Sequence, residues 1–119
     1  MTSLSGKNVL LVEDEWLLAC ELEQAIMAAG ATVAGPYADI KSASADISGV
    51  DLAVLNVNVR DGTTYPLAAM LRERGVPIVF ATGQDMMAEP TQWHSQLWIT
   101  KPYAPAEIIA LLESALPPS

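Results

Sequence analysis

Short apolar segments alternate with amphipathic segments along the whole chain. The apolar segments are rich in Val, Leu, Ile and Ala and are bounded by polar residues, which is typical of strands buried on both faces of a sheet. The pattern predicts strands over residues 9–12, 31–34, 52–57, 76–81 and 97–99.

The segments between these strands carry apolar residues at helical spacing. Leu18, Leu22 and Ile26 recur at four-residue steps, and Gly30 stands where a helix C-terminal cap is expected. The helical pattern over 86–93 is the weakest, because Pro90 interrupts it. The other predicted helices cover residues 40–47, 65–74 and 106–116.

A strand followed by a helix, five times over, predicts βαβ units and a parallel sheet with helices on both faces. The 119 residues are 51% apolar, enough for a real core. We expect one domain over residues 1–119, since a typical domain has roughly 100–150 residues.

The charge balance excludes some classes of partner. The chain has 14 acidic residues against 6 basic ones, and this net charge of −8 argues against a nucleic-acid partner. No run of about 18 apolar residues predicts a membrane span. One cysteine, Cys20, fits a reducing compartment. We therefore expect a cytoplasmic protein with no membrane partner.

Chemically useful side chains follow four of the five predicted strands. In open α/β sheets, ligands bind outside the carboxyl ends of the strands. The residues there are Glu13, Asp14 and Glu15 after the first strand, Asn56 and Asn58 at the third, Thr82 after the fourth and Lys101 after the fifth.

This set of side chains suits a metal and a phosphoryl group. Carboxyl-type oxygens with a backbone carbonyl suit Mg²⁺, and a lysine with a hydroxyl can hold phosphoryl oxygens. Acids after a strand are also favoured simply as the first residues of a helix. That alternative stays open for 13–15 alone, but the four strand ends together favour a site.

Four segments carry a resemblance to a known family: VLLVEDE (9–15), DLAVLNVNVRDG (51–62), PIVFATG (77–83) and WITKPY (98–103). Together they resemble the receiver domain of bacterial two-component response regulators. The resemblance covers nearly the whole chain and implies a flavodoxin-like (βα)₅ sandwich with sheet order 2-1-3-4-5. The FATG segment resembles single-domain receivers of alphaproteobacterial type, although Gln84 follows it where that group has an aromatic residue.

The resemblance implies a role for each matching residue. Asp14 would be the direct Mg²⁺ ligand, Glu13 its acidic companion through water, and Asn58 would offer its backbone carbonyl. Thr82 would be the switch hydroxyl, and Lys101 would bind the phosphoryl group. Trp98 stands near the position of the family's aromatic switch residue. The Lys101–Pro102 bond resembles the family's cis peptide.

Asn56 departs from the family pattern. The family has an aspartate there, whose carboxylate accepts the phosphoryl group as an anionic oxygen nucleophile. An amide has no such oxygen, so the chain is expected not to be phosphorylated as it stands. The lost charge should also weaken the metal site, of which Asn56 is a further member. A natural loss and an engineered substitution both fit.

The resemblance implies a module that acts by binding rather than an enzyme. The partner would be a histidine kinase, a phosphotransfer protein or a downstream regulator. A homodimer could form through the face of the fourth helix, fifth strand and fifth helix, where Trp93, Trp98 and Tyr103 lie. The glycine-rich motifs of dinucleotide and P-loop enzymes are absent. The alternative is a small Mg²⁺-dependent phosphohydrolase-like α/β enzyme.

Overall fold

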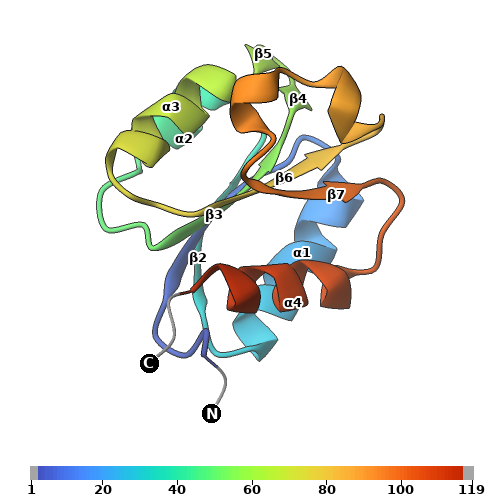
Figure 1. Cartoon of the computed structure of the whole chain (residues 1–119). Coiled ribbons are helices and arrows are strands. Elements are labelled where there is room, and N and C mark those ends of the chain that lie inside the picture. The colour runs from blue at the N-terminus through green and yellow to red at the C-terminus, as the bar shows by residue number, and fades with distance from the viewer. Residues whose placement is uncertain (1–2, 117–119) are drawn as a thin grey trace.

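A five-stranded parallel sheet forms the middle layer of the computed structural model, which describes residues 3–116 (Figure 1). All neighbouring strands pair in parallel. In spatial order they are β2 (Thr32–Tyr37), β1 (Asn8–Val12), β3 (Leu52–Asn56), β6 (Ile78–Thr82) and β7 (Leu97–Thr100). This order confirms the predicted flavodoxin-like sandwich.

Helices cover both faces of the sheet. Figure 1 shows α1 (Trp16–Ala28) and α4 (Pro105–Ala115) on one face, and α2 (Ile40–Ser44) and α3 (Tyr65–Glu73) on the other. Within residues 3–116, no helix is long and apolar enough to cross a membrane. Because successive residues of a buried strand point to opposite faces, each strand contributes to two separate cores.

The two cores follow this alternation along β1. Val9 and Leu11 pack with apolar residues of α1 and α4, whereas Leu10 packs with residues of α3, with Phe80 and with Trp93. All five residues of β3 are buried. The near-continuous apolar runs in the sequence are therefore explained by burial on both faces.

The boundaries of several elements differ from the predicted ones. The strand predicted over 31–34 extends to Tyr37, and the helix predicted over 40–47 ends at Ser44. A short hairpin of β4 (Asn58–Val59) and β5 (Gly62–Thr63) was not predicted. The predicted cap of α1 is confirmed, because Gly30 has φ +95°, which a residue with a side chain rarely adopts.

The prediction of a helix over residues 86–93 is wrong. Two single 3₁₀ turns replace it, η1 (Met86–Ala88) and η2 (Thr91–Trp93). Pro90 lacks a backbone N–H and disfavours the helical conformation of the residue before it, and Glu89 is accordingly extended (φ −88°, ψ 162°). The face expected to include a fourth helix is formed instead by η1 and η2 with β7 and the last helix, α4.

Candidate functional site

The carboxyl ends of β1, β3 and β7 bring three predicted site residues together. Glu13 follows β1 and is 3% exposed, and its Oε1 atom lies 2.9 Å from Nζ of Lys101, which follows β7. A second acid, Glu15, lies 3.7 Å from the same Nζ atom. The lysine is therefore the counterion of a buried carboxylate.

Asn56, the last residue of β3, fills the centre of this site. Its side-chain nitrogen Nδ2 donates to Glu13 Oε2 (3.2 Å), to Asp14 Oδ1 (3.3 Å) and to the backbone oxygen of Asn58 (2.8 Å). An amide nitrogen has two hydrogens, so three oxygens share two N–H groups. We call Glu13, Asp14, Asn56, Asn58 and Lys101 the rim.

Thr64 holds Asn56 in place from the start of α3. This buried residue donates from its hydroxyl to the backbone oxygen of Asn56 (3.0 Å). Its backbone N–H donates to the oxygen of Val57 (2.8 Å). No signal in the sequence marks Thr64 as part of the site, because a threonine before a helix indicates only a helix cap.

The negative charge of the rim is partly neutralised by its own side chains. Burial raises the pKa of the Glu13 carboxyl above its ordinary value, although the backbone N–H of Glu15 and the Lys101 ammonium oppose that shift. The amide hydrogens of Asn56 add partial positive charge between Glu13 and Asp14. Two adjacent acids are thus accommodated by one lysine and one amide.

Thr82, the last residue of β6, lies at the same edge of the sheet, but its hydroxyl forms hydrogen bonds with residues outside the rim. Its buried hydroxyl donates to Oε2 of Glu89 over 2.8 Å and accepts from the backbone N–H of Gln84 over 3.3 Å. Among the described residues, no hydrogen bond joins Thr82 to Asn56. The switch hydroxyl proposed from sequence is therefore already occupied by a carboxylate that the sequence analysis did not single out.

Trp98 on β7 belongs to a group of stacked rings. It is half-buried and stacks on Phe80 with 4.7 Å between ring centroids, and its indole N–H donates to the backbone oxygen of Trp93 (2.9 Å). Trp93 itself is 1% exposed and stacks on Tyr65. Trp93 is therefore a core residue, and the prediction that it lies on an interface is wrong.

No family model and no curated protein matches this sequence. Solved structures do match. SdrG from Sphingomonas melonis Fr1 is 31% identical, with a TM-score of 0.75 over 93% of this chain and 98% of that one. The HemR receiver domain from Leptospira biflexa is 25% identical, with a TM-score of 0.79 over 95% of this chain and 98% of that one. The chain has the fold of a response regulator receiver domain.

A longer protein shares this receiver fold. The response regulator DrrB from Thermotoga maritima, an OmpR/PhoB homologue, is 16% identical, with a TM-score of 0.78 over 88% of this chain. The chain spans only 50% of the DrrB chain. The likeness to DrrB concerns the fold alone.

Whether the rim could hold Mg²⁺ depends on the orientation of the Asn56 side-chain amide. Its nitrogen, a hydrogen-bond donor, faces the oxygens of Glu13, Asp14 and Asn58 that would bind a cation. In that orientation the rim does not fit a metal, since hard cations take oxygen ligands. Mg²⁺ at the rim would require the Asn56 oxygen, rather than its nitrogen, to face the cation.

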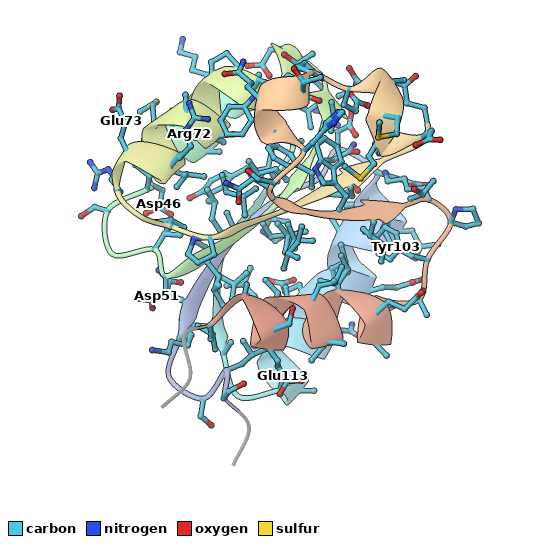
Figure 2. The ribbon with its side chains drawn as sticks, in the orientation of Figure 1. Asp46, Asp51, Arg72, Glu73, Tyr103 and Glu113 are labelled. Atoms are coloured by element: carbon cyan, nitrogen blue, oxygen red, sulfur yellow. The ribbon has the colours of Figure 1, made fainter. Side chains whose placement is uncertain are left out.

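A pocket of about 530 Å³ adjoins the rim of the receiver fold. Its lining includes Leu17 and Leu18 of α1, Pro102 and Tyr103 after β7, and two acids, Glu15 and Glu21. Figure 2 labels Tyr103 beside α1, in the loop that leads into α4. Trp16, next to the pocket residue Leu17, is 76% exposed, and Leu17 itself is 62% exposed. The start of α1 thus presents large apolar side chains to solvent beside a pocket that is lined by two acids and by Lys101.

Proposed function

We propose that this chain is a non-enzymatic receiver of a bacterial two-component system, of the single-domain FATG type, that acts by binding another protein. Its phosphoacceptor position is closed, so it works without accepting a phosphoryl group. The observation that carries this proposal is the hydrogen bonding of the Asn56 amide to the oxygens of Glu13, Asp14 and Asn58.

The chemistry of position 56 supports a closed site. Phosphoryl transfer to a side chain requires an anionic or activated nucleophile. Asn56 is 8% exposed, and its nitrogen is engaged by three oxygens. The lone pair of the Asn56 nitrogen is delocalised into the amide, and the amide oxygen carries no full negative charge. Neither the nitrogen nor the oxygen of the side chain is therefore an effective nucleophile.

Mg²⁺ would be held weakly by the rim. Its ligands would be Asp14, Glu13 through water, the Asn58 carbonyl and the Asn56 oxygen. When bound, the metal would supply positive charge to phosphoryl oxygens. Binding has to displace the hydrogen bonds of the Asn56 amide, and only two acids, Glu13 and Asp14, attract the cation.

The start of α1 is the surface on which we place the partner. Trp16 and Leu17 offer apolar area, and the pocket beside them is lined by Glu15 and Glu21. The chain is also acidic overall. An amphipathic helix of a histidine kinase or phosphotransfer protein, with one apolar side chain and flanking basic residues, has the complementary chemistry. A downstream regulator with such a helix fits equally.

A phosphorylation experiment tests the closed site. The chain is incubated with acetyl phosphate and Mg²⁺, and its intact mass is measured. We expect no phosphoryl adduct on the wild type and one on Asn56→Asp. The matched control is Asn58→Asp, which places a carboxylate two residues away on an exposed side chain and should gain nothing. An adduct on the wild type that hydroxylamine removes, as it removes an acyl phosphate, would overturn the proposal, and so would an inert Asn56→Asp.

A binding experiment tests the partner surface. Purified phosphotransfer and kinase dimerisation domains from the same genome are titrated against the wild type and against Leu17→Ser. We expect a loss of at least about tenfold in affinity, because a large side chain leaves a docked interface. Met27→Ser is the control, since Met27 is 58% exposed on the same helix but outside the pocket lining. Equal losses in both variants would contradict the assignment.

A further inference from the structure

Glu89 is a buried carboxylate that lies outside the rim. It is 7% exposed and stands between η1 and η2, directly before Pro90. Its side chain accepts hydrogen bonds from Tyr65, Thr82 and Gln84. We call these four residues the Glu89 cluster.

Three uncharged donors converge on the two oxygens of Glu89. The Tyr65 hydroxyl donates to Oε1 over 2.6 Å. The Thr82 hydroxyl and the Gln84 amide donate to Oε2 over 2.8 Å and 2.9 Å. Among the described residues, no lysine, arginine or histidine forms an ion pair with Glu89. The donors thus form a neutral oxyanion site, and the chain's own carboxylate fills it.

These hydrogen bonds are strong enough to keep Glu89 ionised. Burial alone disfavours the charged form, but the bonds from Tyr65, Gln84 and Thr82 outweigh it and hold the pKa of the Glu89 carboxyl below its ordinary value. Charge-assisted hydrogen bonds of this kind are about twice as strong as neutral ones. Moving Glu89 out of the site would leave the buried Thr82 hydroxyl and the half-buried Tyr65 hydroxyl without their acceptor.

The Glu89 cluster holds a segment that has little regular structure of its own. Residues 83–93 form only two single turns, so side-chain bonds replace the missing helical ladder. His94 Nε2 lies 2.8 Å from the backbone oxygen of Glu89, and the Trp98 indole donates to the oxygen of Trp93. A change in the position of Thr82 would therefore alter the conformation of residues 83–93 and of β7.

We propose that Glu89 is an internal ligand of the Thr82 hydroxyl, an autoinhibitory contact that keeps Thr82 and residues 83–93 in the resting arrangement. Thr82 can turn toward the rim only when the Glu89 carboxylate releases it. This inference rests on the proposed function, because it is the receiver role that implies a switch role for Thr82. Glu89 is a positioning residue, since its effect on the rim passes through Thr82.

Backbone hydrogen exchange tests the contact without any partner or phosphoryl group. In Glu89→Gln, one acceptor oxygen is replaced by a donor, so at least one of the three bonds is lost. We expect amide exchange in residues 84–98 to rise about tenfold, with β1 and β3 unchanged. The matched control, Asp85→Asn, removes the same charge from an exposed side chain of the same segment and should leave exchange unchanged. Unchanged exchange in Glu89→Gln, or an equal rise throughout the sheet, would overturn the proposal.

Truncation adds an independent measurement. Glu89→Ala leaves the three donors facing an empty site. Acetate carries the same carboxylate group and can take the place of the missing side chain. We expect acetate, but not chloride at equal ionic strength, to restore slow exchange in residues 84–98. Tyr65→Phe removes one donor and keeps the ring, so it should loosen the same segment to a smaller degree. Absence of acetate rescue together with an unaltered Tyr65→Phe would contradict the proposal.

The autoinhibitory part is tested at the rim in the Asn56→Asp background. We expect Asn56→Asp/Glu89→Gln to bind beryllofluoride with Mg²⁺ about tenfold more tightly than Asn56→Asp alone, because no carboxylate competes for Thr82. Equal affinities would overturn autoinhibition. Failure of Asn56→Asp to bind beryllofluoride at all would overturn the proposed function instead, and the exchange experiment would still decide whether Glu89 holds the segment.

Discussion

The side-chain nitrogen of Asn56 donates a hydrogen bond to the backbone oxygen of Asn58, with 2.8 Å between the two atoms. This oxygen is one of those that the rim would offer to a metal. The bond joins residues two positions apart and needs no other part of the fold. Residue 56 therefore determines whether the oxygens of the rim are satisfied by the protein or require a cation.

The first prediction concerns stability at position 56. Asn56→Asp removes the amide bonds to Glu13 and Asp14 and adds a third carboxylate beside them. We expect the variant to be less stable than the wild type by about 1–3 kcal/mol in the absence of metal, since buried acceptors lose their donor. Urea unfolding in EDTA measures this difference. A variant as stable as the wild type would show that the amide bonds contribute nothing.

The second prediction concerns magnesium. Mg²⁺ should restore much of the stability of Asn56→Asp, because a cation relieves the repulsion among three acids, and should change the wild type little. Unfolding is repeated with MgCl₂ and with NaCl at equal ionic strength. Equal Mg²⁺ affinities for the two proteins would exclude residue 56 from the metal shell.

The third prediction concerns the path from the rim to the surface. Phosphorylated Asn56→Asp should differ from its unphosphorylated form in self-association or partner affinity, and adding Trp98→Ala should reduce that difference by about 1 kcal/mol or more. Trp98→Phe serves as the matched variant, because it keeps an aromatic ring against Phe80 but cannot make the hydrogen bond to Trp93. Sedimentation and titration report both quantities. An equal phosphorylation effect in all backgrounds would leave Trp98 a core aromatic only.

The fourth prediction concerns pH. Burial disfavours ionised Glu89, but its hydrogen bonds hold the pKa of the folded-state carboxyl below the ordinary value of 4.5. Its ionised form therefore stabilises the fold above pH 4.5, and that contribution is lost as the pH falls through the lower folded-state value. We expect the stability difference between the wild type and Glu89→Gln to be largest near neutral pH and to shrink in acid. Asp85→Asn provides the baseline, and a difference independent of pH would contradict the assignment.

The fifth prediction concerns Arg72, which Figure 2 labels on α3. Its guanidinium carbon lies 4.3 Å from the centre of the Trp93 ring. Arg72→Gln should lower the free energy of unfolding by about 0.5–1 kcal/mol, the usual strength of an exposed cation–π contact. Arg74→Gln removes the same charge two residues away and should have a smaller effect. Equal losses would assign the effect to net charge.

The strand ends could be predicted because they depend on chain order alone. Parallel strands place their carboxyl ends at one edge, so the alternation of strands and helices was enough to expect Glu13, Asn56 and Lys101 at the same edge. How close they lie depends also on the strand order, which the family resemblance implied. Proline chemistry could also have argued more strongly against a helix over 86–93, since Pro90 was visible in the sequence.

The Glu89 cluster could not be predicted. Glu89 lies 24 residues from Tyr65 in sequence and reaches it across the packed end of α3. A single glutamate in a polar segment is usually solvent-exposed, and no periodic pattern marks it as buried. The burial of Trp93 has the same origin, because it follows from stacking on Tyr65 and Phe80 rather than from helical spacing.

By itself the sequence determined the parallel sheet, its strand order through the family resemblance, and the residues gathered at the rim. Hydrophobic period and chain connectivity are local properties, and they are sufficient for those conclusions. Only the tertiary structure decided that the Asn56 nitrogen faces the acids and that the Thr82 hydroxyl is held by Glu89. Both depend on the orientation of side chains within a few ångströms, which is set by the hydrogen-bond partners that packing brings from distant segments.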